Sequence, residues 1–96
     1  METTFYIKFA IRAMDGFEHF GQFFIGNDRD FAYALFRQLK GKDEVSENNI
    51  LQLDFMETKE NLPLNIRMIR CTLNEMAENC RIITKEMFKY YNLKET

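Results

Sequence analysis

The sequence has few of the residues that most often carry chemistry. Its 96 residues include one histidine, His19, and two cysteines, Cys71 and Cys80. Two cysteines are too few for a disulfide-stapled scaffold, and reduced thiols are typical of cytosolic proteins. The two lie nine positions apart without a CxxC motif, whereas a metal centre needs three or four convergent ligands. The sequence therefore predicts no metal site, no cofactor and a cytoplasmic location.

Long apolar runs are absent as well. No stretch approaches the roughly 20 apolar residues that a transmembrane helix needs. The start, Met-Glu-Thr-Thr, has neither the basic nor the apolar region of a signal peptide. One proline and four glycines exclude a collagen-like or disordered chain. We expect a single domain, 1–96, without a membrane partner.

Positive charge is not in excess. The chain carries 13 basic and 15 acidic side chains, a formal net charge of −2. Net charge therefore gives no reason to expect nucleic acid or an anionic membrane as the default partner. Nucleic acid is a disfavoured partner on this ground, although basic groups gathered on one face would change that expectation.

The clearest positive signal is a β-hairpin at the start of the chain. Two alternating runs, 4–14 and 17–26, flank Asp15-Gly16, the kind of dipeptide that favours a two-residue type I′ turn because both turn residues need positive φ. The expected cross-strand pairs are Met14 with Phe17, Arg12 with His19, Ile11 with Phe20, Phe9 with Gln22 and Ile7 with Phe24.

This register predicts two different faces, because side chains alternate across a strand. The expected core face carries Phe5, Ile7, Phe9, Ile11, Phe20 and Phe24. The expected second face is mixed and carries Tyr6, Lys8, Ala10, Arg12, Met14, Phe17, His19, Phe23 and Ile25. A loop longer by one residue would flip one strand and change both sets.

The rest of the chain repeats the strand–strand–helix plan. We expect a helix over 28–40 closed by Gly41, a polar loop over 41–49, and strands over 50–57 and 64–71, with helix as the alternative for the last. Thr72 and Glu75 have the spacing of a capping box. The apolar stripe after them fits one helix over 73–92 or two linked helices with a restart at Thr84, and we favour two.

Hairpins pair antiparallel, and amphipathic helices need an apolar sheet face to cover. We therefore predict an α+β fold of order ββαββα, with a four-stranded, mainly antiparallel sheet and both helices packed on one face. The sequence does not determine the order of the strands in the sheet.

Catalysis has little support in the sequence. His19 has no neighbouring nucleophile in any recognisable arrangement, and neither phosphate-binding glycine motif, GxGxxG or GxxxxGK[ST], occurs. The acidic residues near 28–30 and 43–47 do not have the spacing of a calcium loop. We expect no catalytic residues and a protein that is not an enzyme.

The second hairpin face is the candidate functional site. We expect it to be an interaction face formed by Tyr6, Lys8, Arg12, Phe17, His19, Phe23 and Ile25. Apolar surface that two helices on the opposite side cannot cover usually marks a partner. The sequence therefore predicts a small non-catalytic protein-interaction module, which most simply forms a homodimer.

Two alternatives remain open. Aromatic rings interleaved with cations on an open sheet also bind single-stranded nucleic acid, although the ribonucleoprotein motif is absent. The abundance of Phe and Met is compatible with a small-ligand pocket between helix and sheet. Arg81, Lys85 and Lys89 share a helix face that we interpret as solvated.

Overall fold

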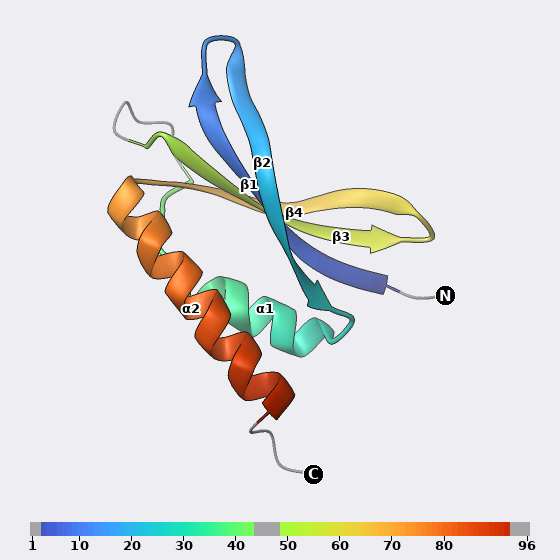
Figure 1. Ribbon diagram of the computed structural model, residues 1–96. Coiled ribbons are helices and arrows are strands. Elements are labelled where there is room, and N and C mark those ends of the chain that lie inside the picture. Colours follow the sequence, from blue (N-terminus) through green and yellow to red (C-terminus); the bar gives the residue numbers. More distant parts are fainter. Residues whose placement is uncertain (1–2, 44–48, 93–96) are drawn as a thin grey trace.

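The structure, a computed structural model, describes residues 3–43 and 49–92. Its elements are β1 (Thr3–Ala13), β2 (Gly16–Gly26), α1 (Arg29–Arg37), β3 (Leu51–Lys59), β4 (Leu62–Cys71) and α2 (Leu73–Asn92) (Figure 1). The predicted order ββαββα is confirmed, and the fourth segment is a strand rather than a helix. The part of the predicted polar loop at 44–48 lies outside the described residues.

The four strands form one antiparallel sheet in the order β2-β1-β3-β4. Pairing of β1 with β3 joins the two hairpins, so that their apolar sides make one surface wide enough for two helices. Both helices lie on the same face of the sheet (Figure 1). The predicted α+β fold class is therefore confirmed.

The core lies between the sheet and the helices. Phe5 and Ile7 of β1 and Leu53 of β3 are fully buried on the helix-covered face. From α1, the ring of Phe36 stacks on that of Phe55 with centroids 4.8 Å apart. Burying side chains of this size stabilises the fold by about 1.5–3 kcal/mol each.

The first helix is shorter than predicted. Asp28 caps it by accepting a hydrogen bond from the Phe31 amide at 3.1 Å, but the helix ends at Arg37 rather than at residue 40. The backbone of Lys40 is held instead by Asn79 of α2, whose side chain accepts from the Lys40 amide at 2.7 Å and donates to its carbonyl at 2.9 Å. These tertiary bonds replace a further helical turn.

The last helix is continuous, so the favoured break before Thr84 is wrong. The capping box is present: the Glu75 amide donates to the Thr72 hydroxyl at 3.2 Å, and the Thr72 amide donates to the Glu75 carboxylate at 2.9 Å. Ile82 and Ile83, at the expected break, are buried in the core. Their packing keeps the helix unbroken through this point.

The turn of the first hairpin differs from the prediction. The turn residues are Met14 and Asp15, and Gly16 is already the first residue of β2, paired with Ala13. Among residues 13–16, all of which the structure describes, only Gly16 has positive φ, at +127°. A type I′ turn at Asp15-Gly16 needs positive φ at both residues, so the predicted turn is wrong. Two adjacent positive φ values occur instead in the β3–β4 hairpin, at Glu60 and Asn61.

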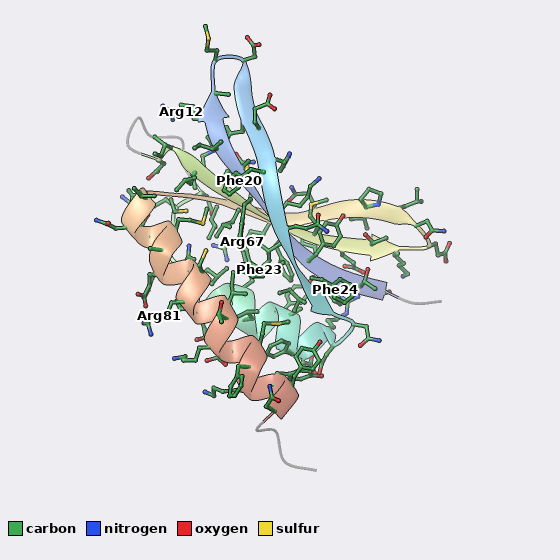
Figure 2. The ribbon with its side chains drawn as sticks, viewed as in Figure 1. Arg12, Phe20, Phe23, Phe24, Arg67 and Arg81 are labelled. Atoms are coloured by element: carbon green, nitrogen blue, oxygen red, sulfur yellow. The ribbon has the colours of Figure 1, made fainter. Side chains whose placement is uncertain are left out.

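The faces of β2 change within the strand and not at the turn, because an inserted residue moves the side chains that follow it to the other face. Two register irregularities interrupt its pairing with β1, and between them Phe23 lies opposite Ile7 and Phe24 opposite Tyr6. Phe23 therefore packs on the core, with its ring 5.2 Å from that of Phe9, whereas Phe24 is 59% exposed. In Figure 2, Phe23 lies between β2 and α2.

Three face assignments are therefore corrected. Phe24 belongs to the face without helices, not to the core. Phe23 and Ile25 belong to the helix-covered side, where Ile25 is 2% exposed. Phe20 contacts Phe9 at a centroid distance of 6.0 Å but remains 57% exposed, because this part of the hairpin rises beyond the helices (Figure 1).

Candidate binding site on the open face of the sheet

We call the face that neither helix covers the open face. Cross-strand partners share a face, so the register arranges its side chains in transverse rows. From the hairpin tip downward the rows are Phe17 and Arg12; His19, Ala10, Gln52, Arg70 and Lys42; Gln22, Lys8, Asp54 and Met68; and Phe24, Tyr6, Met56 and Asn65. The first and last rows are about 20 Å apart, at ~3.3 Å per residue along a strand.

Five of the seven residues of the predicted interaction face lie together here, and two do not. The five are Tyr6, Lys8, Arg12, Phe17 and His19. Phe23 and Ile25 are removed from the face by the register of β2. Arg70, Lys42 and Phe24 take part instead. No sequence signal could have found Arg70 and Lys42, because they join the hairpin residues only through the β1–β3 pairing.

A chain of hydrogen bonds crosses the open face. Arg70 Nε donates to Gln52 Oε1 at 3.1 Å, and Gln52 Nε2 donates to both carboxylate oxygens of Asp54 at 3.1 and 3.3 Å. On the other side, His19 Nε2 lies 3.0 Å from Asp54 Oδ2. The chain passes over β1 at Ala10, whose methyl group leaves room for the imidazole to reach across. Every polar group of Gln52 and Asp54 is thereby held in one arrangement.

Aromatic and cationic groups meet at the upper end of this face. The guanidinium carbon of Arg70 lies 5.0 Å from the ring centroid of Phe17, and that of Arg12 lies 6.0 Å from it. The strands β2 and β4 are separated by two others, about 14 Å at the usual strand spacing. Arg70 and Phe17 nevertheless meet, because their side chains reach toward each other across the two inner strands, and both Gln52 and Asp54 are buried.

Charge on the open face is one-sided. Its described residues include four cations, Lys8, Arg12, Lys42 and Arg70, and one carboxylate, Asp54. Asp54 is only 5% exposed and is already hydrogen-bonded. The chain as a whole has a net charge of −2, so positive charge is concentrated on this face.

The remaining candidate groups have structural roles. Burial raises the pKa of the Cys71 thiol to about 11, with smaller contributions from Glu75 and Cys80. Burial also raises the pKa of Cys80. Both thiols are therefore protonated and weakly nucleophilic at neutral pH. Among residues 3–43 and 49–92, no group of three or more His, Cys, Asp or Glu side chains could hold a metal ion.

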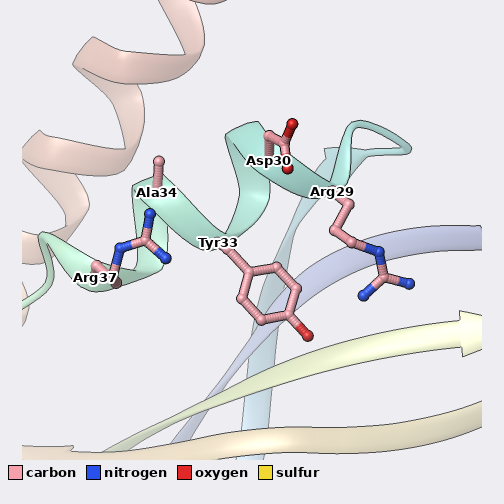
Figure 3. Close-up of a pocket in the computed structure, with 5 residues that line it drawn as sticks. All are labelled: Arg29, Asp30, Tyr33, Ala34 and Arg37. Atoms are coloured by element: carbon pink, nitrogen blue, oxygen red, sulfur yellow. The ribbon is translucent and has the colours of Figure 1, made fainter.

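A shallow hollow lies along α1 (Figure 3) and is lined by Arg29, Asp30, Tyr33, Ala34 and Arg37. Arg29 forms an ion pair with Glu57 of β3 at 3.2 Å. Its guanidinium also lies over the rings of Phe5 and Tyr33, at 5.4 and 5.8 Å. These contacts hold α1 against the sheet. They explain the position of the Arg29 guanidinium, so a bound ligand is not needed to explain it.

The predicted solvated face of α2 is observed. Arg81 pairs with Glu78 one turn away and points away from the sheet (Figure 2). Lys89 pairs with Glu86 at 3.6 Å. These intrahelical pairs need no external partner.

The fold and the open face define a small α+β domain with helices on one side of an antiparallel sheet and an aromatic, cationic surface on the other. Comparisons of the chain with models of known protein families, with curated proteins and with solved structures gave no significant match. Within the part of the chain that the structure describes, neither helix is long and apolar enough to cross a membrane.

Proposed function

We propose that this protein is a small non-catalytic interaction module that associates with a second copy of itself through β2. The observation that carries the proposal is the outer edge of β2, which has no partner strand among the described residues. An edge strand presents a row of backbone donors and acceptors that another strand can pair with.

The composition of β2 favours pairing with its own copy. From Phe20 to Ile25 the strand has no ionisable side chain and no proline, so antiparallel self-pairing brings no like charges together. Phe20 and Phe24 are 57% and 59% exposed on opposite sides of the sheet. A second copy would cover apolar surface on both sides. The register irregularities limit the regular part to Gly21–Phe24, and we therefore expect weak association.

The other sheet edge is protected, which makes the contrast informative. β4 contains Pro63 and the charged residues Arg67 and Arg70, and proline and charge both discourage edge pairing. Its upper end is also paired with Lys42. Of the two edges, that of β2 has the longer stretch without proline or charge, from Phe20 to Ile25.

Apolar surface beyond the helices adds to the same side of the hairpin. Ile11 and Phe20 lie on the helix-covered side and are 43% and 57% exposed. This apolar surface is not the one that the sequence predicts, because Phe23 and Ile25 of the predicted face are packed in the core, but it offers a second copy an apolar contact beside the β2 edge. Free thiols at Cys71 and Cys80 support a cytoplasmic location for the module.

Sedimentation equilibrium over a range of micromolar concentrations tests the proposal. We expect an average mass that rises with concentration toward that of a dimer. Gln22→Lys adds a charge to an exposed position on the β2 edge and should return the protein to a monomer, because two added charges would face each other across the pair.

Asn65→Lys is the matched control, since it adds the same charge to an exposed position on the β4 edge. It should leave the concentration dependence unchanged. A wild-type protein that stays monomeric throughout, or a Gln22→Lys variant that associates as the wild type does, would overturn the proposal.

A further inference from the structure

Beyond self-association, we infer that the open face binds single-stranded nucleic acid. The charge of this face is the first argument. Four cations surround a single carboxylate that is buried and hydrogen-bonded, so the face presents positive charge to solvent. Phosphates of a nucleic acid strand supply the complementary negative charge.

The aromatic side chains give the second argument. Phe17 lies at one end of the face, and Tyr6 and Phe24 lie side by side at the other end. Lys8 and His19 lie between these ends. Bases stack on aromatic rings and on guanidinium planes, whereas the cations between them contact the backbone. Rings at both ends with cations in the middle suit a flexible strand that lies along the sheet.

The rings of the face favour a single strand over a duplex. Phe17 lies at one end beside Arg70, and Tyr6 and Phe24 lie at the other end, but a stiff duplex does not expose the faces of its stacked bases to such rings. A single strand has unstacked bases that can turn toward the rings.

The face is also organised before any ligand binds. The chain from Arg70 through Gln52 and Asp54 to His19 fixes the positions of the arginine and the imidazole. Fixed side chains lose less rotational freedom on binding, which favours affinity. Asp54 thus serves to position cations and does not repel the ligand from the surface.

Fluorescence anisotropy with a labelled oligouridine of about twelve nucleotides, within the range of site sizes of single-strand-binding folds, tests the inference. We expect binding at low salt that weakens with added salt, with a log–log slope of about −2 to −3 for three to four phosphate contacts. Lys8→Gln and Lys42→Gln should each reduce the magnitude of this slope by about 0.7. Neither residue lies on the β2 edge, so these variants separate nucleic-acid binding from self-association.

A pair of matched variants tests the stacking. Tyr6→Ala on the open face should weaken binding roughly 5- to 150-fold, as loss of one stacked base does. Tyr6 lies on β1, away from the β2 edge, so this variant keeps the edge that self-association uses. Phe88→Ala removes a ring that is 56% exposed on α2 and should leave binding unchanged, as should Lys85→Gln on the same helix.

Three results would overturn the inference. The first is no binding at low salt. The second is an equal loss of binding in the open-face and α2 variants, which would place the strand elsewhere. The third is equally tight binding of polyglutamate, which would show that the face contacts an acidic protein segment through charge alone.

Discussion

Ala10 is the residue on which the arrangement of the open face depends. It is fully buried in β1 between His19 and Gln52, and any larger side chain would occupy the space through which His19 reaches Asp54. The contact between His19 and the buried carboxylate of Asp54 follows from this small residue. A buried carboxylate without such partners would cost several kcal/mol.

Cys71 supports a prediction at the same scale. Its thiol has a pKa of about 11 in the folded protein against 9.0 for an unperturbed cysteine. The neutral thiol is favoured by folding, so its contribution to stability is fully present below about pH 9 and is lost as the pH rises toward 11. The whole contribution is about 2–3 kcal/mol.

Chemical denaturation between pH 8 and pH 11 measures this contribution. Cys71→Ala should show a smaller fall in the free energy of unfolding over the interval, by about 2–3 kcal/mol. The other ionisable groups are common to both proteins, so their effects cancel in the comparison. Parallel pH profiles for the two proteins would contradict the assigned burial of the thiol.

At the scale of elements, β2 shows how one inserted residue controls a face. The turn at Met14-Asp15 leaves the first residues of β2 on the predicted faces, and the irregularity between the pairs of Phe9 and Ala10 then exchanges the faces of Phe23 and Phe24. The alternation of residues in the sequence is nearly the same for either register, because aromatic residues occupy both positions. The sequence could therefore predict the hairpin but not which ring is buried.

Stability measurements on two variants test this register. Phe23→Ala removes a half-buried ring that contacts Phe9 and should lower the free energy of unfolding by about 2 kcal/mol. Phe24→Ala removes an exposed ring and should cost less than about 1 kcal/mol. The reverse order of the two losses, measured by urea denaturation, would support the uninterrupted register of β2 that the sequence predicts.

For the helices, by contrast, local signals in the sequence were sufficient to predict where each helix begins. Asp28 and the Thr72–Glu75 box start α1 and α2 as predicted. Their continuation was decided by contacts with distant residues. The end of α1 depends on Asn79, and the continuity of α2 depends on the burial of Ile82 and Ile83.

At the scale of the whole molecule, Asn79 joins parts that are far apart in sequence. It is fully buried in α2, and its side chain bonds both backbone groups of Lys40, 39 positions earlier. It therefore holds the backbone just after α1, at Lys40, against α2. Asparagine supplies the donor and the acceptor that this contact needs.

Asn79→Ala should lower the free energy of unfolding by about 1–3 kcal/mol, because two hydrogen bonds are lost within a packed region. Asn74→Ala, at an exposed position of the same helix, is the control and should change stability by no more than about 0.5 kcal/mol. Equal effects of the two substitutions in urea denaturation would show that the Asn79 contact does not hold the helix in place.

By itself, the sequence determined the order of the elements, the two hairpins and the beginnings of the helices, because alternation, capping residues and turn residues act over a few positions. Only the tertiary structure decided the strand order, the faces of Phe23, Phe24 and Ile25, and the gathering of Arg70 and Lys42 beside the hairpin cations. The physical reason is that pairing of β1 with β3 and packing under the helices act between segments 30 or more positions apart, as in the pair Ala10–Gln52. No local pattern records which of the possible pairings buries the most apolar surface.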